Sequence, residues 1–399
     1  MKLLFHRYGS ICEPDIIEAF KALNITVLEE DMEIHQKSIV PEERIRFLAE
    51  QILTQQVSLV FSINYFPYIS EVCQRLNVIY ACLSVDCPVL ELFSSSIRNS
   101  CNRIFLFDYH QYLQFKDENP SCIFYLPLGT NVDRWDACLS AKNNSEESRW
   151  LYDVSFIGSL YSEKSPYEHL PLSDFDRGYA DGLMKAQLKL SGLSLVEESL
   201  TPALISALKD AASAPDDRSA GFHVLPDAFA DTDAYVAANY FLGMHISALE
   251  RTRILNSLAK RFKVDLFTRS DVSCLEGVHC HDGVSTHHEM PQIFYHSKIN
   301  LNITIRSIQT GLSQRIWDVL GCRGFLLSNY QDEIPEYLQI GTDLDCYESI
   351  SELKEKIEFY LTHEETRMEI AEHGYQTVKE KHTCLRRVVG MLNIIFSDP

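Results

Sequence analysis

The part of this chain that most constrains its fold is residues 297–330. Two short apolar runs, 299–305 and 325–327, flank a segment with helical spacing, and Gly321 and Gly324 are placed to close that helix. The order strand, loop, helix, strand predicts a parallel α/β domain. Charged residues of the loop then lie near the carboxyl end of a strand, where open α/β sheets bind their ligands.

The rest of the chain adds a second domain of the same class. At 399 residues, 46% of them hydrophobic, the chain exceeds one ordinary core and can fill two. Residues 1–30 read as strand, helix and strand, and four further apolar runs follow at 57–63, 78–83, 103–107 and 122–126. We predict a Rossmann-like N-terminal domain over residues 1–150, ending in a polar linker at 139–150.

A second domain is predicted over residues 151–384. Its sheet pattern stops between about 168 and 248, where helical patterns take over, so we predict a helical insertion there. The pattern resumes at 264–268 and 278–282, and three helices close the chain, the last of them within 385–399.

Composition excludes several partners. With 36 basic and 56 acidic residues the net charge is -20, which repels nucleic acid and anionic lipid. No segment is apolar for long enough to span a membrane, and the apolar run before His6 is too short for a secretory signal. Twelve cysteines without a C-x-x-C pair fit reduced thiols. We expect a cytoplasmic protein, and the sequence leaves an oligomer possible.

Several segments together resemble a known family. They are residues 78–128, the DVSFIGSL run at 153–160, residues 289–385 and the HTCLRR run at 382–387. On these the chain resembles the group 1-like GT-B glycosyltransferases, in the branch related to spore-maturation CgeB proteins with a DUF3880-type N-terminal region. The resemblance implies a GT-B fold, with two Rossmann-like domains facing a cleft and a last helix that crosses back to the first domain.

The resemblance also implies a binding site for a nucleotide-diphosphate sugar, with a UDP-sugar favoured. The acidic residue that accepts hydrogen bonds from the ribose hydroxyls corresponds to Asp318, whose two oxygens suit that task. Relatives often carry a second glutamate eight residues earlier, where this chain has Thr310. That departure leaves the stereochemical outcome open, and Asp318 as a plain polar helix residue is the alternative.

Two arginines flank the loop before that helix. Arg306 and Arg315 present guanidinium forks that can hold diphosphate oxygens, and Arg306 can stabilise charge as the diphosphate leaves. In the loop between them, Gly311 and Ser313 can present backbone N–H groups to the same phosphates at the helix start. The alternative for both arginines is an ordinary ion pair.

Residues 279–289 gather four of the fourteen histidines, with a cysteine and an aspartate. Because neither an H-E-x-x-H spacing nor a C-x-x-C pair is present, we do not predict zinc. In GT-B proteins the loop at this place commonly contacts the base, so the resemblance implies that His281, Asp282 and Gly283 lie beside the donor.

Three Asp-x-Asp triplets, at 174–176, 231–233 and 343–345, are of the kind that ligates a metal in other glycosyltransferases. Such triplets arise by chance in an acidic chain, and none follows a suitable strand. We therefore expect neither a metal nor a cofactor.

The N-terminal domain offers candidates for proton transfer. Asp86 follows an apolar strand and precedes a proline that cannot continue it, which predicts a carboxylate at a strand tip, a candidate base toward an acceptor hydroxyl. A turn-capping role is the alternative. His6 is a second candidate base, with a core histidine as the alternative. Gly9 lies at the first strand-to-helix turn, where the resemblance implies contact with the donor.

Together these features predict a metal-independent glycosyltransferase of hexosyl or N-acetylhexosaminyl type. The resemblance implies that the acceptor is either a protein or a glycan of the cell surface or the spore. One alternative is a noncatalytic nucleotide-sugar binder or assembly subunit, which the residues at positions 310 and 318 favour. The other is an NAD-dependent oxidoreductase, for which the chain lacks a G-x-G-x-x-G turn after a strand.

Overall fold

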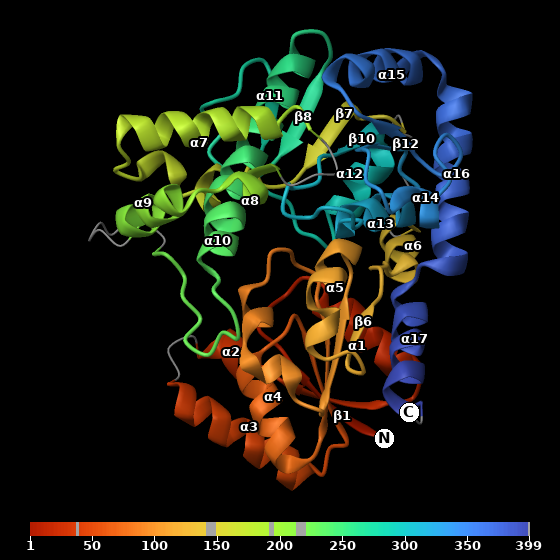
Figure 1. Cartoon of the computed structure of the whole chain (residues 1–399). Helices are drawn as coiled ribbons and strands as arrows, with labels where there is room; N and C mark the ends of the chain where they lie inside the picture. Colours follow the sequence, from red (N-terminus) through yellow and green to blue (C-terminus); the bar gives the residue numbers. More distant parts are fainter. Residues whose placement is uncertain (37–39, 141–148, 191–194, 213–220, 398–399) are drawn as a thin grey trace. The chain divides into compact units, whose positions relative to one another are not determined.

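The structure is a computed structural model that describes residues 1–36, 40–140, 149–190, 195–212 and 221–397 (Figure 1). It divides into two compact units. Unit 1 consists of Met1–Asn131, Leu225–Ala230 and Lys381–Pro399, and unit 2 of Val132–Val224 and Asp231–Glu380. Most of the expected linker, residues 141–148, lies outside the described residues.

Unit 1 contains a six-stranded sheet in the order β2-β1-β3-β4-β5-β6, and all its pairings are parallel. The strands are β1 (Lys2–His6), β2 (Thr26–Glu30), β3 (Leu59–Ile63), β4 (Ile79–Leu83), β5 (Asn102–Leu106) and β6 (Ile123–Tyr125). The helices are α1 (Glu13–Ala22), α2 (Met32–His35), α3 (Pro41–Gln55), α4 (Pro67–Leu76), α5 (Tyr109–Phe115) and α17 (Cys384–Phe396), with 3₁₀ turns η1 (Leu90–Phe93), η2 (Ser95–Arg98) and η3 (Lys116–Glu118).

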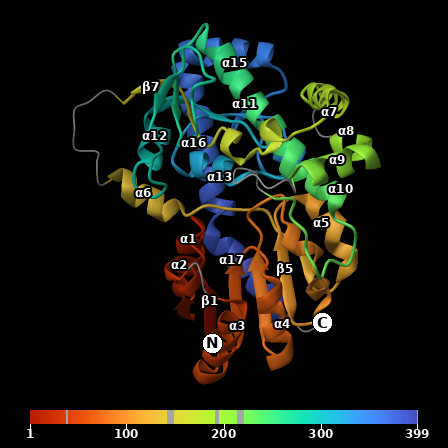
Figure 2. The same cartoon turned by 90° about the vertical axis from the view of Figure 1, so that its left-hand side faces the viewer.

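The sequence of unit 1 explains these elements. Every residue of β3 is buried, as expected for a parallel strand covered on both faces, and Pro67 begins α4 where a missing N–H costs nothing. The last helix, α17, packs on α1, and both lie side by side in Figures 1 and 2. A segment from the insertion, Leu225–Ala230, joins this unit through a bond from Ser95 N to Asp227 O of 2.9 Å.

Unit 2 contains the second six-stranded parallel sheet of the described chain, in the order β12-β11-β10-β7-β8-β9. The strands are β7 (Tyr152–Ile157), β8 (Val264–Phe267), β9 (His279–His281), β10 (Ser297–Asn302), β11 (Leu326–Asn329) and β12 (Asp345–Tyr347). The helices that accompany it are α6 (Val132–Ser140), α12 (Met290–His296), α13 (Gln314–Gly321), α14 (Ile334–Tyr337), α15 (Ile350–Thr362) and α16 (Glu364–Lys381). The strand order reverses between β7 and β10, which makes this the switch point of the sheet.

The helical insertion lies between β7 and β8. It comprises the 3₁₀ turns η4 (Ser162–Lys164) and η5 (Tyr167–His169), then α7 (Asp174–Gln187), α8 (Leu195–Ser199), α9 (Pro202–Ala212), α10 (Asp233–Val236), the π-helix η6 (Ala237–Gly243) and α11 (Met244–Ala259). Helices α7, α8 and α9 gather into one cluster in Figures 1 and 2. α11 is the helix that returns the chain to the sheet at β8.

The end of α13 differs in detail from expectation. The residue in the left-handed conformation is Arg323, with φ of 57°, while Gly324 donates its N–H to Val319 O at 3.0 Å. Gly324 is instead required for close packing, because a Cβ there would lie 2.8 Å from Asn300 Nδ2 and 2.9 Å from Val319 Cγ1. α13 is thereby held tightly against β10.

Candidate functional site

The switch point of unit 2 is crossed by a buried arginine, Arg251 of α11. Its Nη1 donates to Ser159 O after β7, and its Nη2 donates to Ile303 O after β10, both at 2.5 Å. The guanidinium also lies over the Phe156 and Tyr161 rings, with its central carbon 5.2 and 4.7 Å from their centroids. One side chain therefore ties together the two loops at which the strand order reverses.

Arg251 carries a positive charge that is almost wholly buried. Burial lowers the pKa of its guanidinium; the nearby Tyr161 and Glu250 oppose this shift, and the positive charge of Arg315 adds a smaller lowering. In the described part of the chain no carboxylate forms an ion pair with Arg251, since the adjacent Glu250 is engaged by Arg306. A buried cation without a paired carboxylate favours an anionic ligand.

Asp318 lies on α13 and is 4% exposed. Gln314, one turn earlier, donates to Asp318 Oδ1 at 2.9 Å, and Arg315 Nη1 lies 3.9 Å from Asp318 Oδ2. The Arg315 guanidinium lies over the Phe294 ring and contacts the Met290 sulfur. The structure thus brings Asp318 and Arg315 together as predicted, and places Arg315 close enough to Arg251 to affect its pKa.

Arg306 follows β10 and forms a two-point ion pair inside unit 2. Its Nε and Nη2 donate to the two carboxylate oxygens of Glu250 at 2.9 and 2.5 Å, and its Nη1 donates to Leu190 O at 3.0 Å. This is the ion pair that the sequence left as an alternative. Its proposed contact with phosphate stays a prediction.

The loop between Arg306 and α13 is fixed by hydrogen bonds. Thr310 Oγ1 donates to Glu333 Oε1 at 2.7 Å, so a buried carboxylate lies beside the position where relatives carry a glutamate. Gly311 O accepts from Gln331 Nε2 at 3.3 Å. Ser313 is the N-cap residue of α13, but its hydroxyl makes no capping bond to the helix and donates to Asn302 Oδ1 instead. A fixed loop can present its backbone to a ligand with little rearrangement.

The predicted base-contacting residues lie at the end of β9, the edge strand of the same sheet and two strands from β7. His281 Nε2 lies 2.8 Å from Asp265 Oδ1, and its ring stacks on Phe267 with centroids 4.4 Å apart. Asp282 is exposed, and a Cβ on Gly283 would lie 2.3 Å from Arg269 Cγ. Gly283 therefore allows the Arg269 side chain to pass close to the backbone.

His6 in unit 1 belongs to a buried polar cluster. Its Nδ1 lies 2.5 Å from Glu30 Oε2, and its Nε2 lies 3.2 Å from the Tyr68 hydroxyl, which donates to Glu33. Arg44 pairs with Glu33 at 2.6 Å. Both ring nitrogens of His6 have protein partners and the residue is 1% exposed, which is the geometry of a core histidine. A role of His6 as a base stays a prediction.

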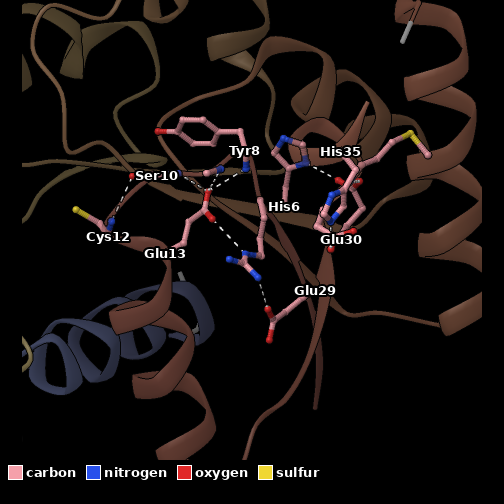
Figure 3. Close-up of polar contacts among 12 residues, drawn as sticks. His6, Tyr8, Ser10, Cys12, Glu13, Glu29, Glu30 and His35 are labelled. Carbon is pink, nitrogen blue, oxygen red and sulfur yellow. Dashed lines mark hydrogen bonds and ion pairs between the residues drawn. The ribbon is translucent and has the colours of Figure 1, made fainter. Parts of the chain in front are cut away.

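The turn after β1 is organised around Glu13, a residue that sequence reasoning did not single out. Its Oε1 accepts from the N–H groups of Tyr8, Gly9 and Ser10 at 2.9, 2.9 and 3.0 Å, and its Oε2 accepts from Arg7 (Figure 3). A turn of this kind binds anions in dinucleotide-binding proteins. Here a carboxylate of the chain already fills it.

The Glu13 arrangement bears on two predictions. The N–H of Gly9 is occupied, although its φ of 97° and the open space around its Cα still allow close approach of a ligand. A pyrophosphate would have to compete with a buried carboxylate at this turn, which disfavours the dinucleotide-dependent oxidoreductase alternative.

Asp86 lies at the carboxyl edge of unit 1 as predicted. Asn64, which directly follows β3, donates its side-chain amide to Asp86 Oδ2 at 2.6 Å and to the Tyr8 hydroxyl at 2.9 Å. Asn64 also accepts from Val85 N and has a φ of 59°. Burial and the Asp86 charge raise the pKa of Tyr8 above its usual range, so Tyr8 remains a phenol. An exposed carboxylate oriented by an amide suits a base.

No group of three His, Cys, Asp or Glu side chains among the described residues is arranged to hold a metal ion. Each Asp-x-Asp triplet has a member with another partner: Asp176 accepts from Ser173, Asp233 pairs with Lys209, Asp343 accepts from Thr377, and Asp345 accepts from Tyr360. Independence from metal nevertheless stays a prediction.

Comparison with solved structures identifies the fold. Solved structures that match include a glycosyltransferase from Rickettsia africae (11% identity, TM-score 0.52, covering 100% of this chain and 99% of that chain). The Anabaena protein HepE in complex with UDP and glucose has 8% identity and a TM-score of 0.55, with 98% of each chain covered. The β-glucosyltransferase of phage T4 has 7% identity and a TM-score of 0.53 over 100% of both chains. The chain has the GT-B fold.

Sequence comparison adds to this. Residues 251–393 match the model of the family described as glycosyl transferase-like. No curated protein sequence matches the chain. The matched part of this GT-B chain includes Arg251, Arg306, Arg315 and Asp318, and so covers the β10 side of the switch point. No helix in the described ranges is long and apolar enough to cross a membrane.

Besides Glu13, three residues at the candidate sites were not found from the sequence. Arg251 lies in a helix without any motif, and only the sheet order shows that it bridges two loops. Glu333 becomes relevant because folding brings it to Thr310. Asn64 had a usable signal in hindsight, because a polar amide directly after a wholly buried GT-B strand marks the carboxyl edge of the sheet.

Proposed function

We propose that this protein is a glycosyltransferase that takes a sugar from a nucleotide-diphosphate sugar, with a UDP-sugar favoured. One observation carries the proposal: Arg251, Arg315 and Asp318 converge where the strand order of unit 2 reverses. Cations there suit a diphosphate, and a carboxylate suits ribose hydroxyls. The glycosyl transferase-like family match over residues 251–393 and the UDP held by the Anabaena protein support the same reading.

In this proposal each group has a chemical task. Asp318 accepts hydrogen bonds from the ribose, while Arg315 and Arg306 hold diphosphate oxygens. The buried charge of Arg251 lies in a medium of low polarity, where it stabilises the negative charge that develops as the diphosphate leaves. We propose that no metal ion is needed, because fixed guanidinium groups supply the positive charge.

We further propose that Asp86 takes the proton of the acceptor hydroxyl, with Asn64 holding the carboxylate in place and Tyr8 beside it. His6 is the second candidate for this task. The acceptor is proposed to be a protein or a surface or spore glycan, as the resemblance to CgeB proteins implies, and the transferred group a hexose or N-acetylhexosamine. A cytoplasmic location and any oligomer remain proposals.

A donor panel tests the proposal. The purified protein is incubated with UDP-, GDP-, dTDP- and CMP-sugars, and both thermal unfolding and release of free nucleotide are measured. At one hundred times its dissociation constant a ligand stabilises the folded protein by about 2.7 kcal/mol, which raises the unfolding temperature measurably. We expect one UDP-sugar to do so and to release UDP slowly.

The same panel separates the alternatives. Stabilisation by a sugar nucleotide without any release of nucleotide would favour the noncatalytic binder. Failure of every sugar nucleotide to bind would contradict both readings.

A further inference from the structure

Unit 2 contains a cavity of about 440 Å³ that adjoins the proposed donor site and shares Arg306 with it. One wall is formed by residues that follow three neighbouring strands: 304–309 after β10, 329–331 after β11 and 347–351 after β12. The other wall comes from the helical insertion, including α11. Its volume lies within the range of about 300–1,000 Å³ for small-molecule sites.

The insertion contributes an irregular segment to this cavity. Ala238, Asn239 and Gly243 line it, and all three belong to the π-helix η6. π-helical turns are rare and occur frequently at functional sites. In this one the Asn239 amide nitrogen donates to Tyr235 O at 3.1 Å, which leaves the side-chain oxygen of Asn239 as an acceptor at the cavity wall.

The polar lining offers both donors and acceptors. Gln331 uses its amide nitrogen on Ile308 O and Gly311 O, and so retains its side-chain oxygen as an acceptor. Tyr330 adds a hydroxyl, and the Arg306–Glu250 pair places a cation and a carboxylate in the same wall. A sugar hydroxyl both donates and accepts hydrogen bonds, whereas a phosphate or carboxylate ligand only accepts them.

Apolar side chains also line the cavity. Ile246 and Ile254 of α11, together with Ile305 and Ile308, alternate with the polar groups. A pyranose has the same mixed character, with C–H faces between its hydroxyls. The charges of the lining nearly balance, since Lys189, Arg253 and Arg306 lie with Glu250 and Glu348, and the whole chain carries a net charge of -20. Such a lining does not select a strongly anionic ligand, and its mixed donors and acceptors favour a neutral one.

We propose that this cavity binds a neutral saccharide, which serves as the acceptor or as the part of the acceptor next to the reacting hydroxyl. The role as acceptor rests on the proposed glycosyltransferase function, whereas saccharide binding itself does not. Residues 304–309 line the cavity and lead directly to the loop before α13, so acceptor and donor share one segment of chain. In this proposal the helical insertion forms one wall of the acceptor site.

Binding of neutral oligosaccharides tests this. The probes are tri- and tetrasaccharides of glucose, galactose, mannose and N-acetylglucosamine, with an oligogalacturonate of equal length as the anionic probe and UDP as the donor-site probe. Two variants of the full chain block the cavity: Ser351→Trp fills its exposed rim, and Asn239→Leu removes an acceptor at similar size. The matched control is Thr362→Trp, exposed at the far end of the same helix.

We expect at least one neutral oligosaccharide to bind the unaltered protein and the Thr362→Trp control by calorimetry and saturation-transfer NMR. Ser351→Trp and Asn239→Leu should each weaken that binding at least tenfold while UDP binding stays unchanged. Absence of binding by every neutral probe, binding that neither variant weakens, or tighter binding of the anionic probe would each overturn the proposal. If saccharide binds and UDP does not, the donor assignment fails and the cavity assignment stands.

Discussion

Replacing Asp318 with asparagine is expected to weaken UDP binding by roughly 10- to 100-fold. Hydrogen bonds to a charged group contribute about 1.5–3 kcal/mol each, and the neutral amide loses that charge. The substitution keeps an oxygen for Gln314, which donates to Asp318 Oδ1 at 2.9 Å, so the fold should persist. Titration calorimetry with UDP measures the change, and thermal unfolding without ligand reports the stability of the variant.

Asp332→Asn is the matched control for Asp318, because Asp332 is an exposed aspartate in the same unit. It should bind UDP like the unaltered protein. An Asp318→Asn variant that is folded and binds UDP with unchanged affinity would show that the ribose is held elsewhere.

Replacing Asp86 with asparagine is expected to leave UDP-sugar binding intact and to lower the rate of UDP release by about 10²–10⁴-fold, the usual contribution of a general base. The geometry behind this is the Asn64 amide, which donates to Asp86 Oδ2 at 2.6 Å and orients the exposed carboxylate. Rates are measured at saturating donor, so that a change in affinity cannot imitate a change in chemistry.

Asp117→Asn, an exposed aspartate elsewhere in unit 1, controls for the loss of one surface charge. It should release UDP at the unaltered rate. If Asp86→Asn turns over normally, the turn-capping role of Asp86 is correct, and His6→Gln becomes the next variant to measure.

Much of the fold followed from local patterns. The strand Lys2–His6 and the closing helices near 351–361, 365–380 and 385–396 are confirmed within a residue or two, because their apolar periodicity is long and regular. The GT-B fold predicted from the resemblance is confirmed. The C-terminal end of α13 was less predictable, since the residue with left-handed backbone conformation there is Arg323 and not a glycine.

The site was predictable only in part. Asp318 and Arg315 are three residues apart on one helix, so helical spacing was enough to bring them together. Arg251 bonds to a carbonyl 52 residues away in sequence, and Glu13 bonds to backbone N–H groups of a turn. No local sequence pattern indicates either contact. The cavity beside the insertion depends on a π-helical turn, which sequence periodicity does not indicate.

A crystal structure of the protein with UDP bound would locate the donor site. We expect the ribose against the Asp318 carboxylate and the diphosphate beside Arg315, at the carboxyl ends of β7 and β10 in unit 2. UDP bound at any other place, with the Asp318 carboxylate left to Gln314 and Arg315 alone, would show that these residues do not bind the donor.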